Sequence, residues 1–181
     1  VNKPDVVGAF LPSGVHLAEA MVDSARVAHS EMVVELGPGS GAITGSILRK
    51  LAPTATFFAM EINEEFVTIM RQRFPHVVVH HDSAANTRQY LEALGKSGCD
   101  SIVSALPWAI FDEPLQDELL NVVWDVLLPG GAFSTYMYAT SRLLPAGRRF
   151  CSKLNQRFGG FETSPIVWKN APPAVVFSVR K

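Results

Sequence analysis

The sequence has little cysteine, no long hydrophobic run and no excess of charge of one sign. Its two cysteines, Cys99 and Cys151, are too few for a disulfide scaffold and lack the spacing of metal ligands. No apolar run approaches the roughly 20 residues that cross a bilayer. With 48% hydrophobic residues over 181 positions, the chain is long enough to bury a core of its own. We therefore expect a globular, cytoplasmic protein without a metal site.

Charge is balanced overall but unevenly distributed along the chain. The formal net charge is −1, yet residues 97–141 carry six acids and no base, and residues 142–181 carry eight bases and one acid. Dedicated nucleic-acid binders usually have a basic excess, so nucleic acid is the less favoured partner. The basic final quarter favours an anionic partner, and we expect a peripheral contact with the inner face of the membrane.

One segment of this quarter has the pattern of a basic amphipathic helix. Over residues 147–158, an apolar stripe lies beside a basic stripe that contains Arg149, Lys153 and Arg157. Such a helix can lie on an acidic membrane. The same pattern is also typical of a helix that packs its apolar stripe, which contains Phe150 and Leu154, against a sheet.

Short apolar runs alternate with amphipathic segments along the chain. The predicted strands are 32–36, 55–61, 77–79, 101–106, 132–138, 162–169 and 174–180. The predicted helices follow Ser13 and then span about 42–51, 63–74 with Asn63 as N-cap, 87–94, 115–127 and 147–158. The last two strands are joined too closely for a parallel crossover. The fold class is α/β: a Rossmann-like, doubly wound, mainly parallel seven-stranded sheet with an antiparallel last strand.

A glycine-rich turn and an acid mark the expected ligand site. Gly37, Gly39 and Gly41 follow the first strand, where ligands bind at the carboxyl edge of an open α/β sheet. Glu61 ends the second strand, 20 residues after Gly41, and is placed to accept hydrogen bonds from a ribose diol. Dinucleotide binding is the alternative, but Glu35 would repel a pyrophosphate, whereas it suits a cofactor that carries an ammonium group. The chain also lacks an evident Tyr-x-x-x-Lys pair for hydride chemistry.

The segment from Val34 to Gly41 resembles the first motif of class I S-adenosylmethionine-dependent methyltransferases. The resemblance implies that S-adenosyl-L-methionine is the cofactor and that Glu35 and the backbone of Gly37, Gly39 and Gly41 hold its methionine part. It implies that Glu61 and Ile62 contact the ribose and adenosine, and that Asp82 and Ser83 lie near the adenine amine. Phe10, Ser13 and Ser104 complete the implied cofactor contacts.

The segment from Ser104 to Trp108 indicates which class of methyl acceptor to expect. This segment is similar to the Asn-Leu-Pro-Tyr type motif of the ribosomal RNA adenine dimethyltransferases, but Ala105 stands where those enzymes have an asparagine acceptor. The chain looks more like the bacterial phospholipid N-methyltransferases. Ser104–Pro107, the segment from Val7 to Ser13 and the pair Thr135-Tyr136 match motifs of that family, although Trp108 is bulkier than expected.

This resemblance implies methylation of the amine of a phosphatidylethanolamine-type phospholipid. In that reaction the Pro107 carbonyl or Tyr136 would orient the neutral amine. Trp108, Tyr136 and Tyr138 would surround a methylated ammonium through cation–π contacts. Residues 1–30 would form a segment and helix that cover the site, and residues 31–181 the methyltransferase core. The alternatives are a nucleic-acid adenine N6-methyltransferase, a small-molecule methyltransferase and a cofactor-binding regulatory module without catalysis.

Overall fold

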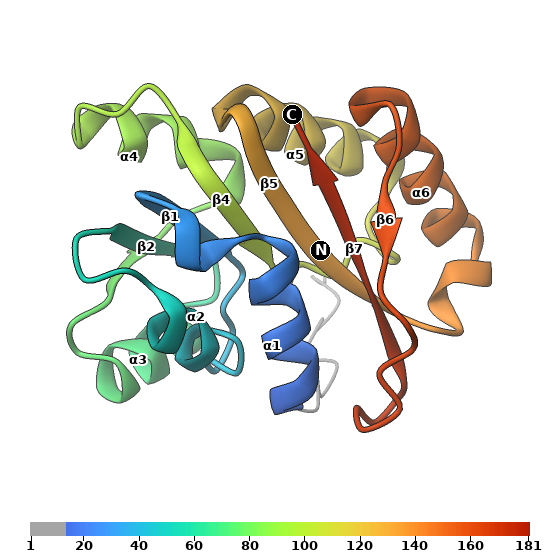
Figure 1. Ribbon diagram of the computed structural model, residues 1–181, viewed down its shortest axis with the longest axis horizontal. Helices are drawn as coiled ribbons and strands as arrows, with labels where there is room; N and C mark the ends of the chain where they lie inside the picture. Colours follow the sequence, from blue (N-terminus) through green and yellow to red (C-terminus); the bar gives the residue numbers. More distant parts are fainter. Residues whose placement is uncertain (1–13) are drawn as a thin grey trace, which may run out of the picture.

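A computed structural model describes residues 14–181, so the predicted contacts of Phe10 and Ser13 lie outside the described residues. Seven strands form one sheet in the order β3-β2-β1-β4-β5-β7-β6 (Figure 1). The strands are β1 (Met32–Leu36), β2 (Thr56–Glu61), β3 (Val78–His81), β4 (Cys99–Ser104), β5 (Leu127–Tyr138), β6 (Glu162–Thr163) and β7 (Ala174–Arg180). The first five pair in parallel, and β7 is antiparallel to both β5 and β6. This arrangement confirms the predicted fold class.

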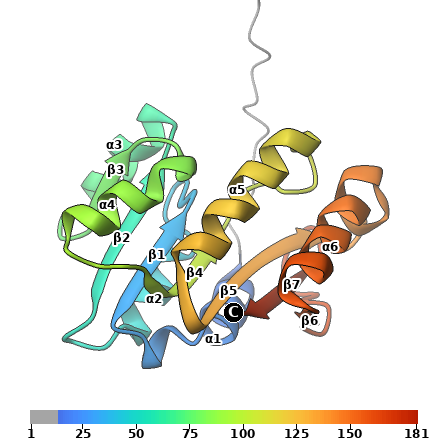
Figure 2. The same cartoon turned by 90° about the horizontal axis from the view of Figure 1, so that it is seen from above.

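Helices cover both faces of the sheet, as Figure 2 shows for α5 and α6 on one side and α1 on the other. The helices are α1 (Val15–Ser24), α2 (Thr44–Lys50), α3 (Glu64–Arg73), α4 (Thr87–Ala93), α5 (Glu113–Val126) and α6 (Pro145–Phe158), with short 3-10 turns η1 (Val27–His29), η2 (Ala84–Asn86) and η3 (Ser141–Leu143). Alternate residues of each strand face opposite layers. Val33 therefore packs with α1 and α2, whereas Val34 packs with α5 and α6.

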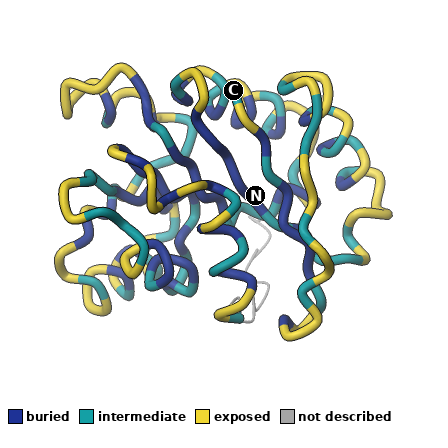
Figure 3. The backbone as a smooth tube through the Cα atoms, in the orientation of Figure 1, coloured by how far each residue is buried: buried dark blue, intermediate teal, exposed yellow. Residues whose placement is uncertain are grey.

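The buried residues form a continuous layer along the central strands (Figure 3). All five residues of β1 are buried, as expected for a central parallel strand with helices on both sides. Asn63 caps α3 as predicted, because its side chain accepts hydrogen bonds from the backbone N–H groups of Glu65 and Phe66. Gly14 occupies the N-cap of α1 without a side-chain hydrogen bond, and α1 packs on β5 and β7 as part of the same core.

Two predicted strands differ from the structure by five residues or more at one end, whereas β2, β3 and β4 differ by one or two residues. The strand predicted over 162–169 is only Glu162–Thr163, followed by a single bridge between Val167 and Ala174. Pro165 lacks an N–H group and interrupts the ladder. By contrast, β5 begins at Leu127 rather than Ala132, because Pro129–Gly131 belong to the strand, where its register with β4 shifts.

The predicted basic amphipathic helix exists as α6, but its two stripes are used within the fold. Phe150 and Leu154 are fully buried in the core. Lys153 forms ion pairs with Glu113, at 3.2 Å, and with Asp117. Of the two uses that the pattern allowed, the structure shows the packed helix, because the apolar side of α6 is covered by the sheet and α5. In the described part of the chain, no helix is long and apolar enough to cross a membrane.

Candidate functional site

The glycine turn follows β1 at the point where the sheet order reverses direction. Gly37, Gly39 and Gly41 have φ angles of +70°, +55° and +85°, which L-residues with a side chain rarely adopt. A Cβ on Gly41 would lie 2.4 Å from Cε2 of Phe74, whereas nothing lies within 4 Å of the Cβ position on Gly39. The turn therefore packs tightly against α3 at one glycine and leaves open space beside another.

Glu35 lies beneath this turn and is completely buried. Its Oε2 accepts a hydrogen bond from Thr44 Oγ1 at 2.7 Å, but its Oε1 has no hydrogen-bond partner within residues 14–181. Burial is the main reason that the pKa of Glu35 is raised to about 8; the Thr44 hydrogen bond opposes the shift, and the charge of Glu61 adds to it. An unpartnered buried carboxylate oxygen is costly and suits a cationic ligand. Sequence reasoning missed Thr44, which has no signal beyond its place at the start of a helix.

Glu61 joins the end of β2 to the glycine turn. Its Oε2 accepts a hydrogen bond from the Gly39 N–H at 3.0 Å, and its Oε1 accepts one from the Asn63 N–H at 2.9 Å. The next residue, Ile62, is 71% exposed and presents an apolar side chain at this edge. Glu35 and Glu61 therefore lie at the ends of neighbouring strands, on either side of the glycine turn, as the sequence predicted.

Asp82 follows β3 and is held by its own loop. Its N–H donates to the Glu61 carbonyl at 3.1 Å, which places it next to the end of β2. Its carboxylate accepts four hydrogen bonds at 2.7–3.0 Å, from Asn86, Tyr90, Ser83 and Gln89. Those from Asn86, Tyr90 and Ser83 are the main reasons that the pKa of Asp82 is lowered. The Ser83 hydroxyl accepts a hydrogen bond from Ala85 N–H, so it caps η2.

The loop after β4 carries the predicted acceptor residues. Ser104 is fully buried, and its hydroxyl accepts hydrogen bonds from Leu106 N–H at 3.3 Å and from the Trp108 indole N–H at 3.1 Å. Its carbonyl accepts a hydrogen bond from Thr135 Oγ1 at 2.9 Å. The Ser104 hydroxyl therefore fixes the turn around Pro107, and the expected contact of Ser104 with the cofactor stays a prediction.

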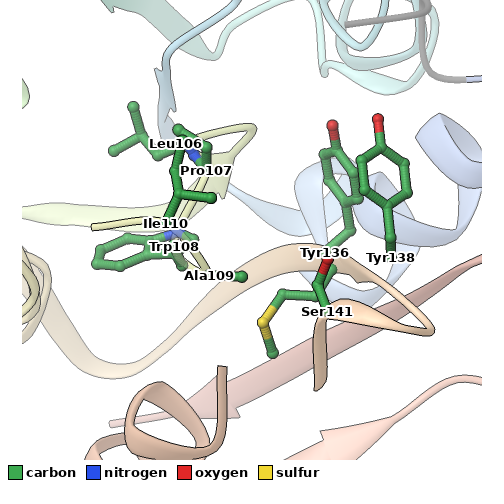
Figure 4. A pocket seen from close by; sticks show the side chains of 9 residues that line it. Leu106, Pro107, Trp108, Ala109, Ile110, Tyr136, Tyr138 and Ser141 are labelled. Carbon is green, nitrogen blue, oxygen red and sulfur yellow. The ribbon is translucent and has the colours of Figure 1, made fainter. Parts of the chain in front are cut away.

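A small cavity of about 70 Å³ opens at this loop. Its lining consists of Leu106, Pro107, Trp108, Ala109, Ile110, Tyr136, Met137, Tyr138 and Ser141. The rings of Tyr136 and Tyr138 stand side by side, with centroids 5.8 Å apart (Figure 4). The cavity is mostly apolar, and none of these nine residues has a carboxylate, an imidazole or an amine. Its chemistry is therefore that of a positioning site without a side-chain base.

The structure does not place Trp108 as predicted. Its side chain is 0% exposed, its ring stacks on Phe150 at 4.8 Å, and its edges contact Phe111 and Phe133. In Figure 4 the indole is turned away from the two tyrosines. Because these aromatic neighbours enclose the ring, Trp108 anchors the loop in the core and is not a cation–π partner for a substrate.

Gln116 is a further residue of this region that sequence reasoning missed. This fully buried residue of α5 donates from Nε2 to the Trp108 carbonyl at 2.7 Å and to the Ala146 carbonyl at 3.1 Å. Its Oε1 accepts a hydrogen bond from Arg149 Nε at 3.3 Å. The sequence holds no signal for this bridge, because its partners lie in two other segments, Trp108 in the loop after β4 and Ala146 and Arg149 in α6. Within residues 14–181, no group of three His, Cys, Asp or Glu residues is arranged to hold a metal ion.

Comparison with known proteins identifies the family. Residues 33–131, more than half of the chain, match the family described as a methyltransferase domain. The chain belongs to this methyltransferase family. The result confirms the resemblance stated from the glycine turn and the acids, and it decides against the regulatory module without catalysis. The enzyme is an S-adenosylmethionine-dependent methyltransferase.

Curated relatives of this methyltransferase act on different acceptors. The chain is 27% identical to the ornithine lipid N-methyltransferase of Singulisphaera acidiphila, over 84% of this chain and 91% of that protein. It is 30% identical to the ribosomal RNA small subunit methyltransferase A of Burkholderia thailandensis, over 57% of this chain but only 38% of that protein.

Solved structures share the fold at low sequence identity. An O-methyltransferase from Bacillus cereus in complex with SAH has a TM-score of 0.72 at 12% identity, covering 93% of this chain and 82% of that one. TrmN from Thermus thermophilus has a TM-score of 0.67 at 19% identity, covering 91% of this chain and 48% of that one.

The residues of this methyltransferase fit the cofactor on two observations. Glu35 keeps one buried carboxylate oxygen without a partner, as a site for an ammonium group requires. The space beside Gly39 and the exposed Ile62 leave room along the ends of β1 and β2. When bound, S-adenosylmethionine supplies the methyl group that is transferred.

Proposed function

We propose that this methyltransferase methylates the amine of a membrane lipid of the phosphatidylethanolamine or ornithine lipid type. The observation that carries the proposal is the similarity to an ornithine lipid N-methyltransferase, which extends over 91% of that protein's length. An apolar acceptor cavity without a side-chain base supports it. A neutral amine needs positioning more than acid–base chemistry in order to attack a methyl group.

We assign the cofactor contacts to the residues at the ends of β1, β2 and β3. Glu35 would hold the ammonium group of the methionine part, and the glycine turn would approach it closely. Glu61 would accept hydrogen bonds from the ribose, with Ile62 against the adenosine. Asp82 and Ser83 would lie at the adenine amine, and the hydrogen bonds around Asp82 keep its carboxylate ionised and able to accept a further bond.

We assign the acceptor side to Pro107 and Tyr136. The Pro107 carbonyl accepts one hydrogen bond, from Ile110 N–H at 3.0 Å, and a carbonyl oxygen has a second lone pair for the substrate amine. Tyr136 lies across the cavity and offers a hydroxyl and a ring face. The amine nitrogen would donate its lone pair to the new N–C bond as the methyl–sulfur bond of S-adenosylmethionine breaks. S-adenosylhomocysteine would leave with that electron pair, and the proton that the amine loses would pass to water.

Label transfer tests the proposal. The full chain is incubated with methyl-labelled S-adenosylmethionine and, separately, with phosphatidylethanolamine, ornithine lipid, free ethanolamine and free ornithine, the lipids being in detergent micelles. The proposal is supported if either lipid is labelled and takes up about tenfold more label than the free amines. Cofactor binding without labelled lipid between pH 7 and pH 9.5 overturns it.

An RNA acceptor is the second candidate, favoured by the match to ribosomal RNA small subunit methyltransferase A. Ala105 argues against it, because its methyl side chain cannot accept a hydrogen bond from a flipped adenine. Ribosomal RNA in the same assay distinguishes the two. Labelled RNA whose yield falls steeply with salt, together with unlabelled lipid, would favour the RNA acceptor.

A further inference from the structure

The acceptor end of the sheet carries an unusual set of exposed apolar side chains. Leu143 is 68% exposed, Leu144 49%, Ile166 39% and Trp168 74%. We call these four residues the docking rim. They come from two segments, the η3 turn that leads into α6 and the loop between β6 and β7, which Figures 1 and 3 show beyond the sheet and largely exposed.

Hydrogen bonds place both segments next to the acceptor cavity. Ser141 lines the cavity, and its carbonyl accepts a hydrogen bond from Leu144 N–H at 3.2 Å. On the other side, Val167 bridges to Ala174, and Ala174 pairs with Tyr138, which also lines the cavity. Trp168 is therefore adjacent to Val167, whose bridge partner Ala174 pairs with a residue of the cavity wall. A fifth exposed side chain, Ile110 at 60%, lines the cavity itself.

The charges around the docking rim are of one sign. Arg142, Arg148 and Lys169 are exposed beside it. Residues 126–161 and 163–181 contain no acid at all, so both rim segments lie in acid-free stretches. Among the described acids, Glu162 of β6 is exposed four residues before Ile166, and at the start of α5 Asp112 caps the helix and Glu113 is paired with Lys153. Within residues 14–181 none of the three bases has an ion pair, and the Arg142 guanidinium lies over the Phe177 ring at 5.4 Å. Exposed tryptophan and leucine side chains next to bases are typical of surfaces that bind anionic membranes.

We propose that the docking rim inserts into the headgroup region of an anionic bilayer and so brings the acceptor cavity to the membrane surface. The inference rests on the proposed lipid acceptor. Trp168, Leu143 and Leu144 enter the interface, while Arg142, Arg148 and Lys169 contact the anionic headgroups. A lipid amine then reaches the cavity without leaving the bilayer. The docking rim is separate from the amphipathic stripes of α6, whose apolar side is buried.

Tryptophan fluorescence tests the insertion directly. Of the three tryptophans, Trp108 is buried and Trp124 is partly buried, so a change at the surface reports Trp168. We expect vesicles containing phosphatidylglycerol to shift the emission to the blue, and lipids brominated on their acyl chains to quench it. The variant Trp168→Phe should lose the blue shift and the quenching. An unchanged spectrum of the full chain with these vesicles overturns the proposal.

A matched pair of variants tests the affinity. The double variant Leu143→Ser, Leu144→Ser should weaken vesicle binding by about tenfold or more, because two leucine side chains are no longer transferred from water into the bilayer. The control Leu94→Ser changes a leucine of similar exposure, 49%, at the far end of α4 and should bind vesicles like the unchanged chain. Equal loss in the control and the rim variant contradicts the proposal.

The failure of the rim and the failure of the proposed function give different results. The rim variant should keep its activity on a short-chain, monomeric amine lipid and lose it on vesicles. Activity on vesicles that equals that of the unchanged chain overturns the docking rim while the lipid acceptor stands. If no amine lipid is methylated even in micelles, the proposed function fails, whatever binds to the vesicles.

Discussion

At the scale of single residues, Glu35 makes the site sensitive to pH. Its pKa is raised from 4.5 to about 8, chiefly by burial, so between these values the folded protein holds a proton that the unfolded chain releases. Stability therefore falls as pH rises through this window. We expect Glu35→Gln to favour the folded state more at pH 8 than at pH 5. The free energy of unfolding of the variant minus that of the unchanged chain should be larger at pH 8 by on the order of a few kcal/mol. Denaturant titrations of both proteins at the two pH values, without cofactor, measure this.

The same carboxyl group links cofactor binding to protons. If Glu35 holds an ammonium group, it must ionise on binding, so binding at pH 7 releases up to about one proton. Calorimetry in two buffers with different ionisation enthalpies detects the release. In Glu35→Gln the buffer dependence should disappear. A buffer-independent enthalpy for the unchanged chain would mean that Glu35 does not contact the cation.

At the scale of elements, the glycine turn depends on its backbone conformation. Gly41→Ala forces a φ of +85° on alanine and brings its Cβ to 2.4 Å from the Phe74 ring. We expect it to lower stability by about 1–3 kcal/mol and to weaken S-adenosylmethionine binding at least tenfold. Gly45→Ala is the control, since its Cβ would meet only ordinary contacts, the nearest at 3.8 Å, inside α2. It should be neutral or stabilising by up to about 1 kcal/mol in thermal unfolding.

The acceptor loop depends on α5 through Gln116. In Gln116→Glu, an ionised carboxylate of nearly the same shape no longer donates to the carbonyls of Trp108 and Ala146. We expect kcat/KM for the acceptor to fall about tenfold, with the dissociation constant for S-adenosylmethionine nearly unchanged, because two buried acceptors lose their donor. Gln156→Glu, on the exposed side of α6, should leave both values as they are. Parallel loss of cofactor affinity in Gln116→Glu would contradict a role confined to the loop.

At the scale of the whole molecule, one core joins the acceptor loop to α5, α6 and β5. Trp108 is the largest fully buried side chain, and its contacts include Phe133 of β5 and Phe150 of α6. We expect Trp108→Phe to lower the free energy of unfolding by about 1–3 kcal/mol, through lost volume and the lost Ser104 hydrogen bond, while KM for the amine changes little. Denaturant unfolding and steady-state kinetics check this. Unchanged stability together with a raised KM for the amine would mean that Trp108 contacts the substrate and does not stabilise the core.

The fold could be predicted because its signals are local. The apolar run of β1, the glycine turn and Asn63 as a cap each depend on a few neighbouring residues. The predicted end of β6 was wrong because a strand also needs a partner, and its pairing is interrupted at Pro165. The role of Trp108 was wrong for a related reason. The sequence shows that an aromatic residue stands beside a motif, but not whether its ring packs in the core or faces a binding site.

Local sequence patterns were enough to predict the order of strands and helices, the cofactor turn and the acids at the ends of β1 and β2, because spacing along one chain places these at one edge of a parallel sheet. Three features became visible only in the folded chain: which face of α6 is buried, which ring Trp108 stacks on, and the bridge that Gln116 makes between three segments. These depend on contacts between residues 30 or more positions apart, for which no local pattern exists. The same long-range packing decides where apolar side chains remain exposed next to the acceptor cavity.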